Sequence, residues 1–192
     1  MSIYSYYIES NGEAFLIDPL NEIHKYEEII KGRNSTLKGV FQTHYHADYV
    51  AGHYDLKKKF NCQIYMGPTA LDNFGVKVLK DNEKITLGDI TFQLIHTPGH
   101  TEESSCLLMY DKNQTQTCIF TGDTMFLNEV GRPDLAVKSN LTVRDLASML
   151  YNSLQKLKSL NNQIRIYPGH GAGSSCGKAI GKGDFCHLEK QK

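Results

Sequence analysis

The sequence carries no excess charge of either sign. Its 192 residues include 21 Lys and Arg against 21 Asp and Glu, so the formal net charge is zero. Proteins that bind nucleic acid or a membrane surface through charge carry a basic excess or a basic stripe. No apolar run approaches the roughly 18 residues of a membrane span, and no basic stretch precedes an apolar one at the start. We therefore expect neither a nucleic-acid partner nor a membrane partner.

Cysteines are few, and none is spaced as a pair. The chain has five, without a C-x-x-C motif: Cys62, Cys106, Cys118, Cys176 and Cys186. An odd number of scattered cysteines without a secretory signal is typical of reduced thiols. We expect a cytoplasmic protein, with the mitochondrial matrix as the alternative.

Proline is scarce too, with 5 residues against 16 glycines, while hydrophobic residues make up 40% of the chain and charged residues 22%. This composition excludes a disordered or collagen-like chain. A chain of this length buries roughly 70% of the surface that it exposes when unfolded, which is enough for a core without disulfides. We expect one globular domain over residues 1–192.

Hydrophobic spacing predicts many short strands and few helices. Helical periodicity predicts helices over 21–31, 53–60 and 142–160. Short apolar runs predict strands over 3–9, 14–18, 37–42, 63–66, 84–87, 91–96, 106–110, 117–121 and 164–167. A long loop over 123–140 and a loop-rich stretch over 168–192 complete the chain. Runs of strands with helices between them favour an α/β (α+β) fold of two packed sheets with helices outside.

Histidines and aspartates lie in short polar or glycine-rich segments that directly follow predicted strands. In the run THYHAD, alternate residues of an extended loop point the same way, so two histidines and an aspartate can converge. The segments TPGH, TGD and PGHG each add one more such residue. Histidine and aspartate are ligands of borderline and hard metal ions. The candidate metal ligands are His44, His46, Asp48, His100, Asp123 and His170.

These four motifs, in this order, resemble the metal-binding motifs of the metallo-β-lactamase superfamily, and the resemblance covers almost the whole chain. It implies an αββα sandwich of two mixed sheets with the metal at one edge. Within the superfamily, GRPDL (131–135) and YPGHGAGSSCGK (167–178) resemble the persulfide dioxygenase branch, also called sulfur dioxygenase. They are most similar to its bacterial-type members, which can be fused to a rhodanese domain.

The residue after Asp48 bears on how many metal ions are bound. Hydrolases of the superfamily usually bind two, and use a histidine at this position for the second. Here the residue is Tyr49, and a phenol with a pKa near 10 is a poor replacement for imidazole at neutral pH. A dizinc site is therefore in doubt.

A single-metal site needs fewer ligands. His44, His100 and Asp123 make a 2-His-1-carboxylate set, which suits non-haem Fe²⁺ with open positions for substrate and oxygen. In the dioxygenase branch the matching positions hold iron. The resemblance leaves the other three candidates to orient ligands or hold water, and direct binding by His46 stays open.

The implied reaction converts a thiol persulfide, O₂ and water into a thiol and sulfite. Activating triplet O₂ requires a one-electron metal, so we expect one Fe²⁺ per chain, with redox-inert Zn²⁺ as the alternative. The substrate would be glutathione persulfide or a similar small molecule. A homodimer and a rhodanese-type sulfur-transfer partner are both open.

Three further residues match catalytic positions of the branch. Arg132 would hold an anionic persulfide or its carboxylate, or else form a surface salt bridge. Tyr167 would lie beside the iron, or else in the core. Cys176 would take or relay sulfane sulfur at the pocket mouth, or else be uninvolved.

Two other functions stay open. A thioester hydrolase like glyoxalase II uses a metal-activated hydroxide, but it needs the dinuclear site that Tyr49 weakens, and a helical extension that we do not expect from the residues after Gly171. A non-catalytic binding subunit with this fold is the third possibility. A missing core metal ligand would favour that possibility, but His44, His100 and Asp123 are all present.

Overall fold

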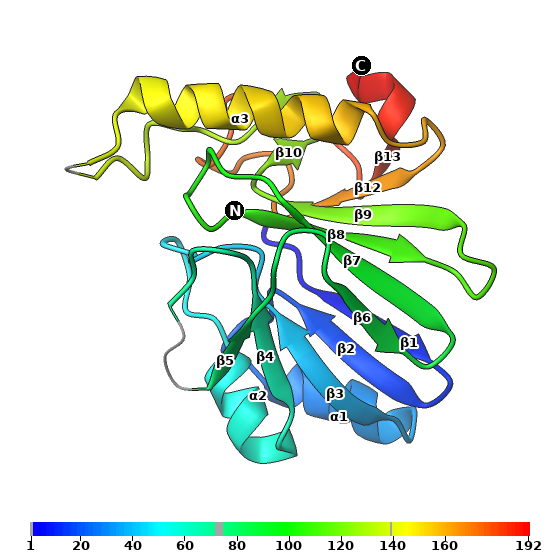
Figure 1. Cartoon of the computed structure of the whole chain (residues 1–192). Helices are drawn as coiled ribbons and strands as arrows, with labels where there is room; N and C mark the ends of the chain where they lie inside the picture. Colours follow the sequence, from blue (N-terminus) through cyan, green and yellow to red (C-terminus); the bar gives the residue numbers. More distant parts are fainter. Residues whose placement is uncertain (1, 72–74, 139) are drawn as a thin grey trace.

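Two β-sheets pack face to face, and helices cover their outer faces (Figure 1). The computed structural model describes residues 2–71, 75–138 and 140–192. In chain order the first sheet and its helices come first, and the long helix α3 lies between β9 and β12 of the second sheet. This αββα arrangement is the fold that the sequence predicts.

The first sheet is mostly parallel. Its strands, in spatial order, are β1 (Tyr6–Ser10), β2 (Glu13–Ile17), β3 (Thr36–Phe41), β4 (Gln63–Met66) and β5 (Val76–Val78). Only β1 and β2 pair antiparallel. Parallel neighbours need crossover connections, and α1 (His24–Gly32) lies in the connection from β2 to β3, while α2 (His53–Phe60) lies in that from β3 to β4. Tyr26, Ile30 and Leu56 of these helices pack on the outer face of the sheet.

The second sheet is mostly antiparallel. Its strands, in spatial order, are β13 (Cys186–His187), β12 (Arg165–Pro168), β9 (Gln116–Gly122), β8 (Ser105–Tyr110), β7 (Ile90–His96) and β6 (Lys84–Leu87). Only β9 and β12 pair in parallel, and α3 (Val143–Lys158) is part of the crossover between them. The helix begins at a capping box between Thr142 and Asp145. Its Leu157 packs on the outer face of this sheet.

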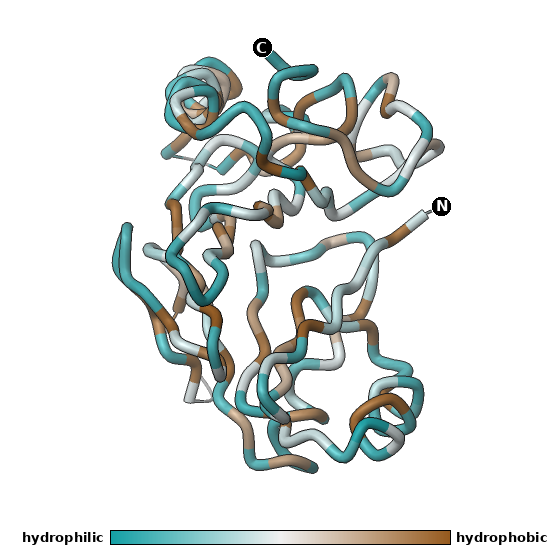
Figure 2. Tube along the Cα trace, turned by 90° about the vertical axis from the view of Figure 1, so that its right-hand side faces the viewer, coloured by the Kyte–Doolittle hydropathy of each residue, from teal (hydrophilic) through white to brown (hydrophobic). Residues whose placement is uncertain are grey.

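The main core fills the space between the sheets. Phe15 of the first sheet stacks on Phe92 of the second, with ring centroids 5.3 Å apart. Phe41, Leu107 and Phe120 belong to the same buried cluster. Hydrophobic and hydrophilic residues alternate in short stretches along the trace (Figure 2). Because this core joins the two sheets, it also fixes the relative positions of the strand ends that carry the candidate metal ligands.

Most predicted elements are confirmed, and α2, β4 and β6 have the predicted bounds. The strand predicted over 3–9 is shorter at its start, because Ile3 instead forms an isolated bridge with His170. The prediction missed β5, the β10–β11 ribbon (Met125–Phe126 and Glu129–Val130), β13 and a 3₁₀ helix over Leu188–Gln191. The ribbon lies inside the long loop predicted over 123–140, in which Ser139 is outside the described residues. Among the helices that the structure describes, none has the length and hydropathy of a membrane span.

Candidate metal centre

Strand ends bring the candidate ligands to one edge of the sandwich. In the second sheet, β7, β9 and β12 run in the same direction. The segments after these three strands carry His100, Asp123 and His170, and the segment after β3 of the first sheet carries His44. These loops meet at the open edge between the sheets.

Three of the six candidates form what we call the primary group: His44, His100 and Asp123. All three are buried, and their ligand atoms lie within 4.8 Å of one another. Oδ2 of Asp123 lies 3.9 Å from Nε2 of His44 and 3.6 Å from Nε2 of His100. This carboxylate oxygen is buried and has no hydrogen-bond partner among the described residues.

Hydrogen bonds fix the tautomers of both imidazoles. The hydroxyl of Thr43 donates its single proton to Asp18 at 2.8 Å, so it accepts from Nδ1 of His44 at 2.9 Å. Nδ1 of His100 donates to the carbonyl oxygen of Arg132 at 3.1 Å. Each neutral ring therefore presents the lone pair of its Nε2 toward the unpartnered oxygen of Asp123.

This arrangement fits a metal ion. Two lone pairs and a carboxylate oxygen that converge in a buried space repel one another unless a cation lies among them. Metal–ligand bonds of about 2 Å each can span nitrogen–oxygen separations of up to about 4 Å. Burial lowers the pKa of His44 well below its usual value. Burial pushes the pKa of Asp123 up, but His44 and the hydrogen bond from His170 outweigh it and lower that pKa. Neutral imidazole and ionised carboxylate are the metal-binding forms.

A second cluster, which we call the secondary group, adjoins the first and consists of Asp48, His170 and Cys176. Nδ1 of His170 donates to Oδ1 of Asp123 at 2.8 Å, and its Nε2 lies 2.8 Å from Oδ2 of Asp48. Burial lowers the pKa of His170, but the hydrogen bond to Asp123 and the charges of both carboxylates outweigh it and raise that pKa. Burial, followed by the nearby charge of Asp123, raises the pKa of Cys176 to about 12. Asp123 thus serves both groups, with one oxygen toward each.

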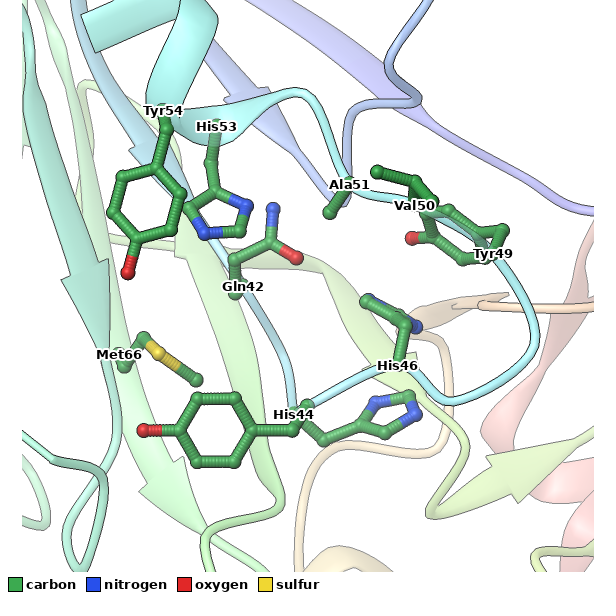
Figure 3. A pocket seen from close by; sticks show the side chains of 10 residues that line it. Gln42, His44, His46, Tyr49, Val50, Ala51, His53, Tyr54 and Met66 are labelled. Carbon is green, nitrogen blue, oxygen red and sulfur yellow. The ribbon is translucent and has the colours of Figure 1, made fainter.

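His46 does not join the primary group. Its Nε2 lies 3.0 Å from Oδ1 of Asp18, and its ring packs against the ring of Tyr49 at a centroid distance of 4.4 Å. The hydroxyl of Tyr49 donates to the backbone oxygen of Asp18 at 3.3 Å. Burial raises the pKa of Tyr49 well above its usual value, so the phenol stays neutral. Figure 3 shows His46 and Tyr49 on the loop around a cavity of about 310 Å³, into which the start of α2 brings His53.

The three predicted catalytic residues lie in different surroundings. The guanidinium of Arg132 donates to both carboxylate oxygens of Asp134, at 3.1 and 2.5 Å, and to the backbone oxygen of Ser175 at 3.3 Å. This is the salt bridge that the sequence left as the alternative. The ring of Tyr167 packs with Tyr6, Phe120 and Phe185, so the structure places it in an aromatic cluster.

Cys176 lines a pocket next to the primary group. A cavity of about 410 Å³ is lined by polar residues of both groups and by apolar residues of the 131–138 segment. Its lining residues are His44, Tyr45, Ala47, Asp48, His100, Thr101, Leu135, Ala136, Ser175 and Cys176. A substrate in this cavity would contact both imidazoles of the primary group and the thiol.

Sequence reasoning missed the residues that support the ligands. Asp18 accepts the backbone N–H and the hydroxyl of Thr43, and buried Glu103 accepts the N–H of Tyr45 at 3.0 Å. A Cβ on Gly169 would lie 2.6 Å from Oδ1 of Asp123, so only glycine allows this approach. An aspartate between an apolar strand and a proline was a usable signal for Asp18, whereas Glu103 gave none.

Comparison with known families agrees with this architecture. Residues 1–170 match the model of the Metallo-beta-lactamase superfamily. The chain belongs to the metallo-β-lactamase superfamily. Sequence relatives of this superfamily member include the probable polyketide biosynthesis zinc-dependent hydrolase PksB of Bacillus subtilis, 32% identical over 92% of this chain and 76% of that protein. Hydroxyacylglutathione hydrolase 1 of Vibrio vulnificus is 32% identical over 87% of this chain and 61% of its own length.

Solved structures of the superfamily extend the comparison. A metallo-β-lactamase from Staphylococcus aureus superposes with a TM-score of 0.85 at 27% identity, over 100% of this chain and 62% of that one. ETHE1 from Myxococcus xanthus superposes with a TM-score of 0.77 at 28% identity, over 93% of this chain and 75% of that one. The chain spans about three-fifths of the length of the hydroxyacylglutathione hydrolases that it matches. These relatives fit either a metal-dependent hydrolase or an ETHE1-like enzyme.

Proposed function

We propose that this superfamily member is a mononuclear non-haem iron persulfide dioxygenase. The reaction is RSSH + O₂ + H₂O → RSH + SO₃²⁻ + 2 H⁺, in which O₂ accepts four electrons from sulfur. The observation that carries the proposal is the primary group: two histidines with fixed tautomers and one buried carboxylate oxygen without a partner. Two neutral imidazoles and one carboxylate suit Fe²⁺ with open positions.

The identity of residue 49 supports one metal over two. The superfamily's two-metal sites use a second imidazole after Asp48, and here the hydroxyl of Tyr49 bonds to the backbone of Asp18 instead. His44, His100 and Asp123 would hold the ion. Iron, when bound, supplies the one-electron chemistry that O₂ requires.

The chain's own residues bind and orient the substrate. The cavity beside the primary group offers the apolar side chains of Leu135 and Ala136 to a small thiol such as glutathione persulfide. Cys176 lines the same cavity, so its sulfur would lie close to a bound persulfide. As a protonated thiol, Cys176 can donate a hydrogen bond to an anionic persulfide sulfur.

The cysteines favour a reducing compartment for this reaction. All five are free, and four of them are buried. We therefore place the enzyme in the cytosol, with the mitochondrial matrix as the alternative. A homodimer or a rhodanese-type protein that passes sulfur to the substrate thiol remains a further proposal.

The second candidate is a metal-dependent thioester hydrolase. Asp48 and His170 lie 2.8 Å apart beside Asp123, which is where a second ion of a hydrolytic site would bind. The names of relatives at about 30% identity, such as hydroxyacylglutathione hydrolase, give this candidate its weight. A zinc ion in the primary group would serve this reaction through an activated water.

Metal analysis and two substrates separate the candidates. The chain is purified under argon without added metal, its metal content is measured, and O₂ uptake with glutathione persulfide is compared with hydrolysis of S-lactoylglutathione. We expect about one iron per chain and persulfide-dependent O₂ uptake with sulfite as product. Zinc with thioester hydrolysis and no O₂ uptake would replace the proposal with the hydrolase.

A matched pair of variants ties the activity to the site. Asp123→Asn removes the charge between the two imidazoles, so metal content and O₂ uptake are expected to fall together. Asp89→Asn makes the same change in the exposed turn between β6 and β7 and is expected to leave both unchanged. An Asp123→Asn variant that keeps full activity would refute the assignment.

A further inference from the structure

The cavity of about 310 Å³ at the start of α2, which we call the α2 cavity, contains buried polar atoms that the metal centre does not use (Figure 3). Nε2 of Gln42, Nδ1 of His46 and Nδ1 of His53 are buried and have no hydrogen-bond partner among the described residues. All three residues line the cavity. Buried polar atoms are normally hydrogen-bonded, because the water that they lose must be replaced. Their gathering around one cavity points to an occupant that carries hydrogen-bonding atoms.

Gln42 is the residue of this set that folding explains least. It directly follows β3 and is 2% exposed. Its backbone N–H donates to the oxygen of Tyr65 at 3.0 Å, which holds the main chain, while the amide end of its side chain points into the cavity (Figure 3). A methionine would fill the same space without leaving a buried polar atom unpaired, which costs stability. The amide is therefore a candidate for ligand binding.

The lining of the α2 cavity favours an uncharged occupant. Among the described residues that line it there is no lysine, arginine, aspartate or glutamate, so an ion would lose its water without gaining a counter-charge. His46 and His53 are absent from the groups of convergent metal-binding side chains that the described residues form. Nε2 of His46 instead lies 3.0 Å from Oδ1 of Asp18. The cavity therefore suits a neutral molecule better than an anion or a metal ion.

The remaining walls suit a flat ring. Tyr45, Tyr54 and Met66 line the cavity, and aromatic faces and thioethers pack favourably against rings. The ring of Tyr54 packs against that of His53 at a centroid distance of 4.2 Å. A carboxamide such as that of Gln42 presents a hydrogen-bond donor beside an acceptor. It can pair through two hydrogen bonds with a ring edge that carries the same two atoms in the opposite order.

We propose that the α2 cavity binds an uncharged, planar nitrogen heterocycle whose edge carries a hydrogen-bond donor next to an acceptor. The amide of Gln42 would pair with this edge, and the imidazole of His53 would offer a further hydrogen bond. Tyr54 and Met66 would cover the faces of the ring. His44 lines this cavity as well as the one beside the primary group, so the heterocycle would lie next to a candidate metal ligand without being one itself.

The lactam 2-pyridone is the probe, because its N–H lies next to its C=O on one edge of the ring. The metal-free chain, labelled with ¹⁵N, is titrated with 2-pyridone while NMR follows the side-chain amide of Gln42. We expect a saturable shift of this amide resonance. N-methyl-2-pyridone has the same ring without the donor, and we expect it to bind about tenfold more weakly. No saturable shift at millimolar 2-pyridone, or equal binding of the two molecules, would overturn the proposal.

A matched pair of variants ties the binding to the amide. Gln42→Met keeps the length of the side chain and removes the amide, so we expect 2-pyridone to bind about tenfold more weakly. The same variant is expected to have an equal or higher urea midpoint, because an unpartnered buried amide is replaced by an apolar group; this measurement also shows that it folds. Gln155→Met makes the same change at an exposed position of α3 and is expected to bind 2-pyridone normally. Affinities are taken from the resonances of the probe, and unchanged binding in Gln42→Met refutes the site.

The result is independent of the reaction at the primary group. Gln42 and His53 belong to neither group of candidate ligands, so metal-free and metal-loaded chains are expected to bind 2-pyridone equally. His100→Ala removes a ligand of the primary group and is expected to lose metal but keep this binding. Binding that requires the metal would show that the heterocycle ligates the ion, and would overturn the site. A chain that binds 2-pyridone but does not oxidise persulfide would reject the proposed function alone.

Discussion

Asp18 and Thr43 make a two-point contact in the buried interior: the backbone N–H and the hydroxyl of Thr43 donate to the two carboxylate oxygens of Asp18, each at 2.8 Å. Asp18 follows β2, and Thr43 lies in the segment after β3. The contact therefore ties the segment that carries His44 to a neighbouring strand. It also orients the imidazole, because the Thr43 hydroxyl accepts from Nδ1 of His44.

Thr43→Val tests this contact, because valine keeps the shape and loses the hydroxyl. Asp18 and His44 each lose a buried partner, so we expect the free energy of unfolding to fall by about 1–3 kcal/mol and metal affinity to fall by about tenfold. Urea denaturation and metal competition measure the two. Thr43→Ser retains the hydroxyl and is expected to stay close to the unmodified chain. Equal metal affinity in both variants would mean that the hydroxyl does not orient His44.

Gly169→Ala probes the close approach behind Asp123. The added Cβ would lie 2.6 Å from Oδ1 of Asp123, the oxygen that also accepts from His170. The carboxylate must move, so we expect weaker metal binding and a loss of roughly 1–3 kcal/mol of stability from overpacking. Gly32→Ala is the control, because it adds the same methyl group at the end of α1 with nothing within 4 Å. Unchanged metal binding in Gly169→Ala would show that Asp123 tolerates the shift.

Phe92→Ala tests whether the space between the sheets is the main source of stability. Phe92 is fully buried and stacks on Phe15 of the other sheet. Removing its ring leaves a cavity, and we expect the free energy of unfolding to fall by about 3–5 kcal/mol. Phe185→Ala removes a ring that is 47% exposed and is expected to cost far less. Urea denaturation of both variants at one temperature gives the comparison, and equal losses would contradict it.

Local sequence patterns predicted the helices and strands whose hydrophobic periodicity can be read from their own residues. The α2 helix and the β4 strand have the predicted bounds, and the hairpin between β8 and β9 follows from two apolar runs around a polar turn. The ribbon β10–β11 could not be predicted, because strands of two residues exist only through their pairing. Strands this short contain too few residues to show a periodic hydrophobic pattern.

The candidate metal centre shows the same difference between features that follow from local sequence and features that depend on how strands pack. Motif spacing predicted six candidate ligands after apolar strands, and the family resemblance then favoured His44, His100 and Asp123 as the ligands of a single ion. Motif spacing did not predict that Nε2 of His46 would lie 3.0 Å from Oδ1 of Asp18, since that depends on how β2 lies beside β3. Tyr167 was predicted either beside the metal or in the core, and alternation along β12 turns its ring to the aromatic cluster between the sheets.

Arg132 and Asp134 offer a way to distinguish a substrate contact from a positioning contact. The guanidinium spans Asp134 and the backbone oxygen of Ser175, which lines the cavity next to Cys176. The side chain is not needed to hold His100, because the backbone oxygen of Arg132 does that. Arg132→Ala is therefore expected to keep its metal.

If the proposed reaction is correct, loss of the Arg132 guanidinium loosens the cavity wall at Ser175 and does not change metal binding. We expect Arg132→Ala to raise the KM for the persulfide by about tenfold, the equivalent of one hydrogen bond to a charged group, with little change in kcat. Asp134→Ala releases the same guanidinium and is expected to raise the KM in the same direction. An increase in Arg132→Ala alone would instead mean that the guanidinium binds the anionic substrate directly, as the sequence resemblance implies. Steady-state O₂ uptake by the two variants, with metal content measured on the same samples, decides between these roles.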